Sequence, residues 1–549
     1  MSARKALYYA YCVGGSAKEA IKESIQFGGK SAKQYVNTSI VLRPILSQFQ
    51  CYHDPAWEEA KSLSKSLRNG QTHVKHSNKA GVRHYSTSSR RSIQKPTKEL
   101  TEEEREKLAN ERSSQVPASR ISRLFHYGSL AAGIGMNAAA EGLSQVSKGQ
   151  SPNWKSLILS ESNIDRITKK FSQMRGAALK IGQMMSFQDE KILPRELYEI
   201  LSRVQNSANY MPRRQLEKVM TKELGDNWEA KFKSFDKIPI AAASIGQVHN
   251  GELLDGTKIV VKVQYPGVKD SIDSDLNNLL LLLTASRLLP KGLFLDKTVA
   301  NARTELKWEC DYIREAKALQ RFELLLKDDP VFVVPHVYEE FTTENVLTMS
   351  RMEGTEIMNL KNESNSQEIR NFISENIMRL CLEEIAVFEF MQTDPNWANF
   401  LYNAKTNKIE LLDFGASRPF PSDFIKKYRK LLTYATQENR AGAYEMSKEL
   451  GYLTGLESQS MKDAHVDSVM TLGEPFRGSV EDVFDFANQT VSDRIRGNIG
   501  LMVNERLCPP PEETYSLHRK FSGIFLLCAR MEASVHCAKL FSKYFALKE

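Results

Sequence analysis

The stretch "NFLYNAKTNKIELLDFGAS", residues 399–417, is the most informative part of this 549-residue chain. It predicts a short strand, a turn at 403–407, a second strand and then the tripeptide Asp413-Phe414-Gly415. The tripeptide alone says little, because it occurs by chance in many long proteins. Asp394 stands five residues before Asn399, and a single hairpin accounts for the interval from Asn399 to Asp413. Together these residues supply carboxylate and amide oxygens, the hard ligands that Mg²⁺ takes in proteins.

That order matches a protein-kinase catalytic loop, in which the first Asp lies near the transferred phosphoryl group while the Asn and the later Asp hold Mg²⁺. The upstream residues agree. Lys262 lies in "KIVVKV", on the strand after an Asp255-Gly256 turn, and Glu315 in "WECDYIREA" is its expected partner on a following helix. An edge-strand lysine and a solvated acid would explain Lys262 and Glu315 singly, but not five residues in this order. We therefore predict an ATP·Mg²⁺ site with catalytic residues Lys262, Glu315 and Asp394 and metal ligands Asn399 and Asp413.

The pattern along the chain predicts an α+β fold with two lobes. We expect helices over 154–230, strands over 232–265 and a long helical stretch over 270–327. On one such helix Glu309 and Glu315 would face different partners, because six residues set them about 120° away from a shared face. Two short strands, "VFVVPHV" and "NVLTMSRM", precede mostly helical sequence. We place the smaller lobe at 231–354, the helical lobe at 355–549, and the adenine-binding hinge at Met352, Glu353 and Gly354.

Three features separate the chain from an ordinary protein kinase. Ala241, Ala242, Ala243 and Ser244 stand where a Gly-x-Gly-x-x-Gly loop would cover the phosphates. Their Cβ atoms restrict the backbone, which predicts a stiffer loop against the nucleotide. Thr393 stands where many regulated kinases have an arginine, and helical sequence resumes soon after Gly415 without an activation segment or an Ala-Pro-Glu motif. These features argue against a protein kinase that acts in trans.

The first 98 residues differ in composition from the rest of the chain. They contain 17 Lys and Arg against 5 Asp and Glu, so that of the total formal charge of +8 the remaining residues carry about −4. Many basic and Ser residues with few acids are typical of a mitochondrial transit peptide, and Arg83, Tyr85 and Ser86 resemble a matrix-peptidase site. A disordered basic tail is the alternative. Because the folded part is not basic, we do not expect nucleic acid as a partner.

Residues 99–153 are predicted to be a linker with an apolar helix over 124–140, "LFHYGSLAAGIGMNAAA". A membrane-spanning helix needs about 20 apolar residues, so a packing helix, an interfacial helix and a marginal span all stay open, with membrane contact favoured because Arg120 and Arg123 precede the segment. The seven cysteines show no CxxC pairing, which favours buried thiols in a reducing compartment over zinc or a disulfide framework.

Several separated motifs, in this order, resemble the UbiB family, also called aarF-domain-containing or ADCK atypical kinases, in its mitochondrial coenzyme Q branch. They span roughly residues 120–545 and comprise "KIGQ", "AAASIGQVHNG", "VVKVQYPGV", "WECDYIREA", "TDPNWANFLY", "LLDFGASR" and "PPPEETYSLHRK". The resemblance implies an atypical protein-kinase-like fold, ATP bound with Mg²⁺, ATP hydrolysis, and support of ubiquinone biosynthesis on the matrix face of the inner mitochondrial membrane. The implied partners are coenzyme Q biosynthetic enzymes, the membrane lipid surface and lipid-like quinone precursors, and a homodimer stays open.

In "KIGQMMSFQ", residues 180–188, Lys180, Gly182 and Gln183 are unusual for a helix that otherwise looks buried. A snorkelling lysine beside a close helix contact is one explanation. The resemblance implies another, in which this helical extension folds across the active site and blocks access of peptides. Lys180 and Gln183 share a helix face, and Glu309 is the expected ion-pair partner of Lys180.

These observations favour an ATPase or small-molecule kinase that supports coenzyme Q biosynthesis. A nucleotide-binding pseudokinase scaffold is the first alternative, although the complete set of five site residues speaks against it. A protein kinase acting in trans is the second alternative.

Overall fold

The computed structural model describes residues 120–147, 160–174, 210–285, 295–362 and 367–545, together with positions 199 and 203. Contacts between Cα atoms divide the chain into two units, Met1–Glu99 with Gly135–Ile158, and Leu100–Ile134 with Leu159–Glu549. Helix α5 (Arg120–Ser147) runs across the boundary between the units. The second unit also holds α7 (Glu161–Met174), α10 (Arg213–Leu224) and all residues of the predicted nucleotide site that the structure describes. None of the helices in the described ranges has the length and hydrophobicity needed to cross a membrane.

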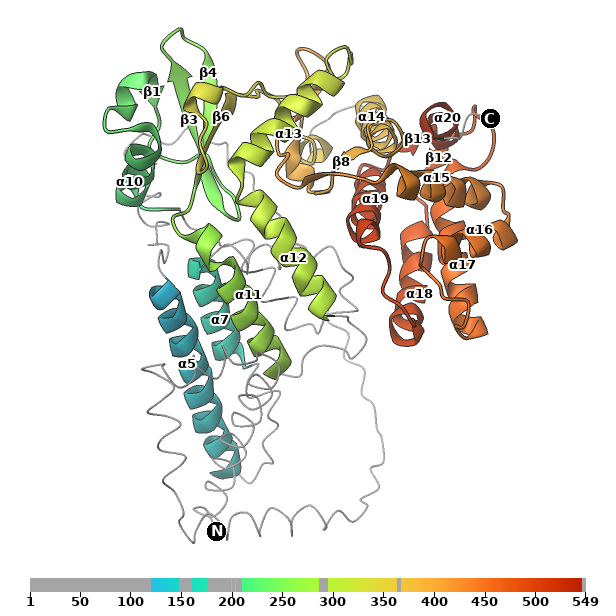
Figure 1. Ribbon diagram of the computed structural model, residues 1–549, viewed down its shortest axis with the longest axis horizontal. Coiled ribbons are helices and arrows are strands. Elements are labelled where there is room, and N and C mark those ends of the chain that lie inside the picture. The colour runs from blue at the N-terminus through green and yellow to red at the C-terminus, as the bar shows by residue number, and fades with distance from the viewer. Residues whose placement is uncertain are drawn as a thin grey trace. The chain divides into compact units, whose positions relative to one another are not determined.

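An antiparallel sheet forms the smaller lobe (Figure 1). Its strands follow the order β1 (Phe232–Phe235), β3 (Gly246–Leu253), β4 (Lys258–Gln264) and β6 (Val346–Ser350), and the short β2 (Ala241–Ala242) pairs with β3. The predicted hairpin at Asp255-Gly256 is confirmed, and Gly256 has the positive φ of +90° that a tight turn requires of glycine. Alternation along β4 turns Ile259, Val261 and Val263 into the core of the lobe. Lys262 therefore projects from the opposite face of the sheet.

Among the described residues, the helical stretch expected over 270–327 contains α11 (Val268–Ala285), α12 (Leu295–Glu309) and α13 (Tyr312–Leu325). The placement of Glu309 and Glu315 on one helix is wrong, because α12 ends before α13 begins. Asp311 ends the run because its side chain caps α13 by accepting a hydrogen bond of 3.0 Å from the backbone N–H of Arg314. The carbonyl of Cys310, at the end of α12, accepts from the buried Gln264 side chain in β4 at 3.1 Å. Glu309 and Glu315 therefore lie on different helices, so the angle predicted from a single helix does not apply.

A second sheet carries the segment from which the sequence analysis began. It has the order β5 (Phe332–Val333), β10 (Lys408–Leu411), β9 (Phe400–Asn403) and β7 (Thr355–Glu356), and the predicted β9–β10 hairpin with its turn at 403–407 is confirmed. The two strand predictions around 332 and 346 are confirmed as β5 and β6. Next to the hairpin, β8 (Phe390–Gln392) pairs antiparallel with β11 (Ser417–Pro419), which joins the segments that contain Asp394 and Asp413.

The rest of the larger lobe is helical, as expected. Its main helices are α14 (Gln367–Ala386), α15 (Ser422–Thr436), α16 (Arg440–Glu449), α17 (Gln459–Gly473), α18 (Val491–Glu505), α19 (Glu512–Arg530) and α20 (Cys537–Leu540), with a small β12–β13 pair (Phe484–Asp485, Ser534–Val535). The larger lobe also has the short helical turns η3 (Asn359–Asn362), η4 (Trp397–Asn399) and η5 (Glu474–Phe476) and a π-helical turn η6 (Phe541–Phe545). Two further turns, η1 (Trp228–Lys231) and η2 (Glu339–Phe341), lie in the smaller lobe. The predicted α+β class with two lobes is confirmed.

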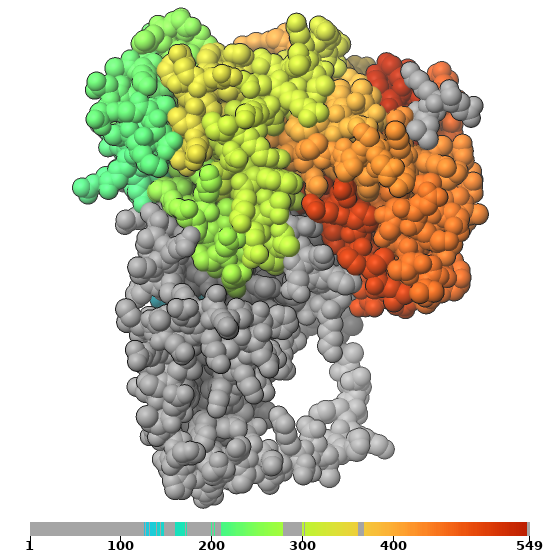
Figure 2. All heavy atoms as spheres, viewed as in Figure 1, coloured from blue at the N-terminus to red at the C-terminus, as the bar shows by residue number. Residues whose placement is uncertain are grey.

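Helix α13 lies between the two lobes. On one side it contacts β6, and on the other Phe322 packs against Phe414 and Phe390, with ring centroids 4.7 and 5.3 Å apart. Figure 2 shows the residues from about 300 to 350, in yellow-green, between the green sheet and the orange C-terminal helices. This helix therefore contacts both the sheet of the smaller lobe and the Asp-Phe-Gly segment.

Candidate active site

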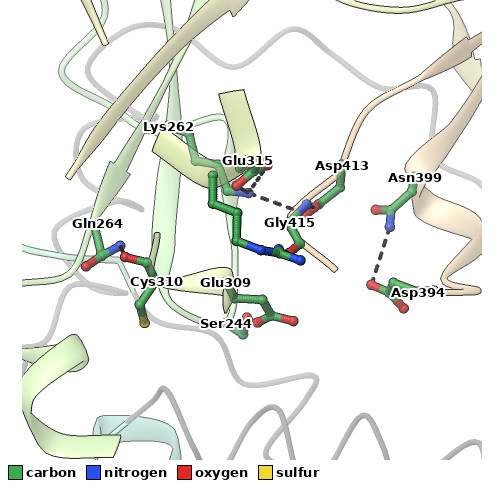
Figure 3. Close-up of polar contacts among 11 residues, drawn as sticks. Ser244, Lys262, Gln264, Glu309, Cys310, Glu315, Asp394, Asn399, Asp413 and Gly415 are labelled. Atoms are coloured by element: carbon green, nitrogen blue, oxygen red, sulfur yellow. Dashed lines mark hydrogen bonds and ion pairs between the residues drawn. The ribbon is translucent and has the colours of Figure 1, made fainter. Parts of the chain in front are cut away.

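A buried ion pair joins the two lobes at the predicted lysine. Lys262 Nζ lies 2.8 and 3.0 Å from the two carboxylate oxygens of Glu315 in α13 and 3.4 Å from Oδ2 of Asp413 (Figure 3). The Lys262 side chain is 8% exposed and that of Glu315 is fully buried, whereas Asp413 is 37% exposed. The structure thus brings together three of the five predicted residues, and Asp413 is the one that opens toward solvent.

One lysine in this cluster faces two carboxylates. Burial lowers the pKa of Lys262, but the carboxylates of Asp413 and Glu315 raise it by more, so the pKa lies well above the usual value. Burial raises the pKa of Glu315 to about 7, and Asp413 adds to the rise while Lys262 opposes it. The lysine is therefore a fixed cation, and Asp413 is its partner on the partly exposed side of the cluster.

Asp394 and Asn399 lie on the other side of Asp413 in the close-up view (Figure 3). Asn396 caps η4 by accepting from Ala398 N–H at 3.2 Å, which shapes the loop between the two residues. The Asn399 amide nitrogen donates to Asp394 Oδ2 at 3.4 Å, and the amide oxygen is turned to the side of Asp413. Asp413 Oδ1 accepts from Gly415 N–H at 2.9 Å, which fixes its carboxylate. A carboxylate and an amide oxygen thus lie on the same side of the lysine cluster.

This donor set fits a hard divalent cation. Mg²⁺ is usually held by one or two protein oxygen ligands together with phosphate oxygens and water, and Asp413 and Asn399 supply two such groups. Within the described ranges no group of three or more His, Cys, Asp and Glu side chains could hold a metal ion by itself. Such a cation would therefore depend on the nucleotide for its remaining ligands.

The predicted nucleotide loop is partly a strand. Ala241 and Ala242 form β2, whose partners in β3 are Val248 and Gln247, and the turn closes with a hydrogen bond of 2.8 Å from Ala243 N–H to Gly246 O. Ala241 and Ala242 thus belong to the strands expected over 232–265, and Ala243 and Ser244 lie in the turn. Ser244 Oγ lies 3.4 Å from Glu309 Oε2, so the turn faces the end of α12.

The segment 352–354 follows β6 and leads into β7, where a hinge was predicted. Gly354 N–H donates to Glu410 Oε2 at 2.8 Å, and the other Glu410 oxygen accepts from Asn403 at 2.8 Å. A Cβ atom at Gly354 would lie 2.9 Å from both Leu401 and Glu410, so glycine is required for this close approach. On the smaller-lobe side, exposed Glu353 pairs with Lys258 at 2.9 Å.

The structure adds residues that the sequence analysis missed. Arg314 donates to the carbonyl oxygen of Gly415 at 2.9 Å and also to that of Ser417, and its guanidinium stacks over Trp308 at 4.6 Å. Lys520 donates to Gln392 near the start of the catalytic loop. Arg314 and Lys520 stand in two of the quoted motifs, but neither has a spacing to its partner that a sequence pattern could reveal.

Three further predictions have different outcomes. The residues Lys180, Gly182 and Gln183 lie outside the described residues, so their predicted contact with Glu309 stays a prediction. The short connection after the Asp-Phe-Gly segment is confirmed, because β11 begins at Ser417 and α15 at Ser422. Of the described cysteines, Cys310, Cys381, Cys528 and Cys537 are buried free thiols, as expected, whereas Cys508 is a half-buried free thiol.

Comparison with known proteins agrees with a kinase-like fold. A family model described as ABC1 atypical kinase-like domain matches residues 203–447. The chain is 79% identical over 445 residues to atypical kinase COQ8, mitochondrial, of Saccharomyces cerevisiae, which covers 81% of this chain and 88% of the relative. It is 52% identical over 431 residues to the protein of the same name from Schizosaccharomyces pombe, covering 78% of this chain and 70% of that one. Atypical kinase COQ8B, mitochondrial, of Rattus norvegicus is 48% identical over 437 residues, covering 78% and 81%.

Proposed function

Because the chain belongs to the UbiB family of atypical kinases, whose domain is also called ABC1, we propose that it is an ATP-hydrolysing enzyme that supports coenzyme Q biosynthesis in mitochondria. The family implies ATP and a metal ion in general terms, and we propose that the metal is Mg²⁺. The observation that carries the proposal is the buried Lys262–Glu315 pair, with the more exposed Asp413 at 3.4 Å from the same amino group.

We propose the following roles for the residues of the site. Lys262, oriented by Glu315, binds the α- and β-phosphates, because its amino group is a fixed cation at the boundary between the lobes. Asp413 and Asn399 hold Mg²⁺, which when bound neutralises charge that develops on the phosphates. Asp394 positions the attacking water or hydroxyl through its carboxylate. The alanine turn at 241–244 lies over the phosphates, and 352–354 offers backbone groups to adenine.

The short link after Gly415 bears on what is phosphorylated. Arg314 holds Gly415 and Ser417 directly to α13, and α15 starts at Ser422, so the usual peptide-docking segment has no room in this part of the chain. We therefore favour water or a small, lipid-like quinone precursor as the acceptor over a protein acting in trans. The proposed plug formed by Lys180, Gly182, Gln183 and Glu309 would act in the same direction.

The location and partners rest on the relatives, whose names call them mitochondrial. We propose that residues 1–98 direct import, that the protein works at the matrix face of the inner membrane, and that the enzymes of coenzyme Q biosynthesis are its partners. Residues 1–98 fused to a fluorescent protein should reach the matrix and be cleaved. A cytosolic fusion would contradict the assignment of this leader.

The test of the catalytic proposal is ATP turnover by the purified protein, with and without Mg²⁺, for wild type and Asp413→Asn. We expect Asp413→Asn to lose at least 100-fold in kcat, on the order of 2.7 kcal/mol in activation free energy, while its thermal unfolding stays close to that of the wild type. Asp423→Asn, at an exposed acid of α15, is the matched control. Phosphate release that is equal in Asp413→Asn and wild type would refute the metal role. No turnover by the wild type would instead favour a nucleotide-binding scaffold.

A further inference from the structure

Helix α19 contacts both ends and the middle of the segment 392–400, which includes the proposed catalytic loop. It belongs to the larger lobe, where its Arg519 also pairs with Glu305 of α12 at 2.8 Å, and none of the roles assigned above uses it. We propose that α19 positions this loop, with Lys520 and Gly523 as positioning residues. The inference rests on the proposed Mg²⁺·ATP site. It concerns the contacts that hold Asp394 and Asn399 at a fixed position relative to Asp413.

Lys520 is buried, with a side chain only 2% exposed. Its amino group donates to the backbone carbonyl of Gln392 at 2.7 Å and to the Gln392 side-chain oxygen at 2.9 Å, and it lies 3.5 Å from the buried Glu384 carboxylate. It also lies 5.7 Å from the centroid of the Phe400 ring. Gln392 stands two residues before Asp394, and Phe400 directly follows Asn399. One cation thus contacts the residues on both sides of the loop.

Burial of a lysine costs several kcal/mol unless its charge and donors are satisfied. An ion pair with Glu384 alone would satisfy the charge without involving the loop. Instead, the two shortest contacts of the amino group go to Gln392, and Glu384 accepts from the backbone N–H of Gln392 at 3.2 Å. The buried pair therefore holds the backbone of one residue, Gln392, at both its N–H and its C=O group.

Gly523 lies one turn further along α19 and supports the middle of the loop. A Cβ atom at this position would overlap the Cβ of Pro395, the residue next to Asp394, so the close approach requires glycine. Trp397 Nε1 donates to the carbonyl oxygen of Gly523 at 3.2 Å, and the Arg530 guanidinium lies 4.7 Å from the Trp397 ring centroid. The same face of the helix thus contacts two residues of the loop.

The support extends to the second metal ligand. Gln392 pairs with Ser417 in the β8–β11 ladder, and Thr393 Oγ donates to the carbonyl oxygen of Ala416 at 2.7 Å. A shift of Gln392 would therefore move Asp394 and the segment around Asp413 relative to one another. Metal-free nucleotide binding should be spared, because Lys262 and the hinge do not contact α19 in any described interaction.

The test compares Gly523→Ala with Gly473→Ala in full-length protein. Gly473 is a buried helical glycine of α17, where a Cβ atom would lie 2.6 Å from the Cβ of Ala435, away from the loop. We expect Gly523→Ala to lower kcat for ATP by about 100-fold, the effect of a displacement of about 1 Å in an active site, and to raise the Mg²⁺ concentration for half-maximal activity at least fivefold. Gly473→Ala should change both by less than twofold, and ATP binding in EDTA should match wild type in both.

Lys520 is tested in the same assays by Lys520→Met combined with Glu384→Gln, so that no unpaired buried charge remains.

If Gly523→Ala does not fold, Trp397→Phe replaces it, since this change removes the donor to Gly523 without adding an atom. Trp228→Phe is the control for this variant. A kcat loss no greater than in the control, or an unchanged Mg²⁺ requirement, would overturn the inference. Failure of wild-type turnover, or full activity of Asp413→Asn, would overturn the proposed function instead, so the two failures are distinguishable.

Discussion

Among single residues, Lys262 has the surroundings that most constrain the chemistry. A single buried ammonium group faces two carboxylates, one fully buried and one open to solvent. A divalent cation next to Asp413 would offset the charge of its carboxylate, and this attraction is stronger inside a protein because effective dielectric constants there are far below that of water. Such a cation would also bind phosphate oxygens, and this is the physical reason to expect metal and nucleotide to bind together.

The substitution Glu315→Gln separates orientation of the lysine from its charge balance. Glutamine keeps one acceptor for the Lys262 amino group but removes the buried charge, so the lysine should move toward Asp413. We expect kcat/KM for ATP to fall by about 10- to 100-fold, equivalent to about 1.4 to 2.7 kcal/mol. Stability should change little, because burial already raises the pKa of Glu315 to about 7 and so makes the charged form costly to bury.

Steady-state ATP turnover and thermal unfolding are the measurements for this variant. Glu323→Gln is the control, since Glu323 lies on the same helix but pairs with His336 at the exposed surface. Full turnover in Glu315→Gln would show that Lys262 needs no buried carboxylate.

Ala243→Gly tests the stiffness of the nucleotide turn. Ala243 donates its N–H to Gly246 O at 2.8 Å, so the turn geometry can persist with glycine. Glycine costs about 0.5–1 kcal/mol through the entropy of the unfolded chain, yet it allows the backbone a different approach to the phosphates. We expect the ratio of ATP to ADP affinity, or kcat, to change at least threefold with a small loss of stability. Unchanged binding and turnover would contradict the assigned role of the turn.

Residues that belong to one spacing pattern could be predicted from the sequence, and residues tied by long-range contacts could not. Asp394, Asn399 and Asp413 are joined by one loop and one hairpin, so their intervals carry the information. Lys520 is 128 residues from Gln392, and Arg314 is 101 residues from Gly415. The number of residues between two positions says nothing about their contact at that range. The contacts of Lys520 and Arg314 could therefore be found only in the folded structure.

Among the structural elements, α13 carries more of the site than the sequence suggested. It supplies Glu315 to the lysine, Arg314 to the backbone after Asp413, and Phe322 to the ring of Phe414. In regulated kinases, phosphorylation controls the placement of the corresponding helix and segment. Here the contacts are made by residues of the helix itself, so we expect the active arrangement to form without a modification.

Arg314→Lys should weaken this arrangement while the helix stays intact. Lysine retains the charge but cannot donate in the fork geometry to two carbonyl groups while stacking on Trp308. We expect kcat to fall about 10-fold, with metal-free ATP affinity retained, in stopped-time assays of phosphate release. Arg321→Lys, on the same helix where Arg321 stacks 4.0 Å from the Phe390 ring, is the matched control. Equal activity of the two variants would show that Arg314 does not hold the segment.

The break between α12 and α13 shows where periodicity fails. The apolar pattern continues through 306–322, so it predicted one helix. α12 ends where Cys310 O accepts a hydrogen bond from Gln264 in β4. α13 begins where the side chain of Asp311 caps it. A single capping residue inside an unbroken apolar pattern is a weak signal in sequence, although the local physics is decisive once the sheet is in place.

In the whole molecule, acid stability should be governed in part by buried neutral histidines in both lobes. Burial lowers the pKa of His249 and of His518 to about 4 each, and that of His465 to about 3. An unfolded histidine titrates near 6.5, so the unfolded state binds more protons between about pH 6.5 and 4. Stability is therefore fully present above pH 6.5 and is lost as pH falls toward 4, by about 1.4 kcal/mol per pH unit for each histidine.

Denaturant unfolding at pH 7.5, 6.0 and 5.0 measures this slope. His249→Gln should make the dependence shallower by about one proton, since it removes one of the groups, whatever its effect on stability at neutral pH. His336→Gln, at an exposed histidine, is the control. Parallel slopes in all three proteins would contradict the prediction.

The packing of Phe414 has a consequence for ligand chemistry. Its ring is 1% exposed and stacks on Phe322, while the residues after it are tied to α13 by Arg314 and to β8 by the β11 ladder. Inhibitors that need this ring to swing out and vacate a pocket behind the nucleotide would have to break all of these contacts. Selective compounds for this protein should therefore be sought among those that occupy the adenine and phosphate positions with the ring in place, and competition with a fluorescent nucleotide would distinguish the two classes.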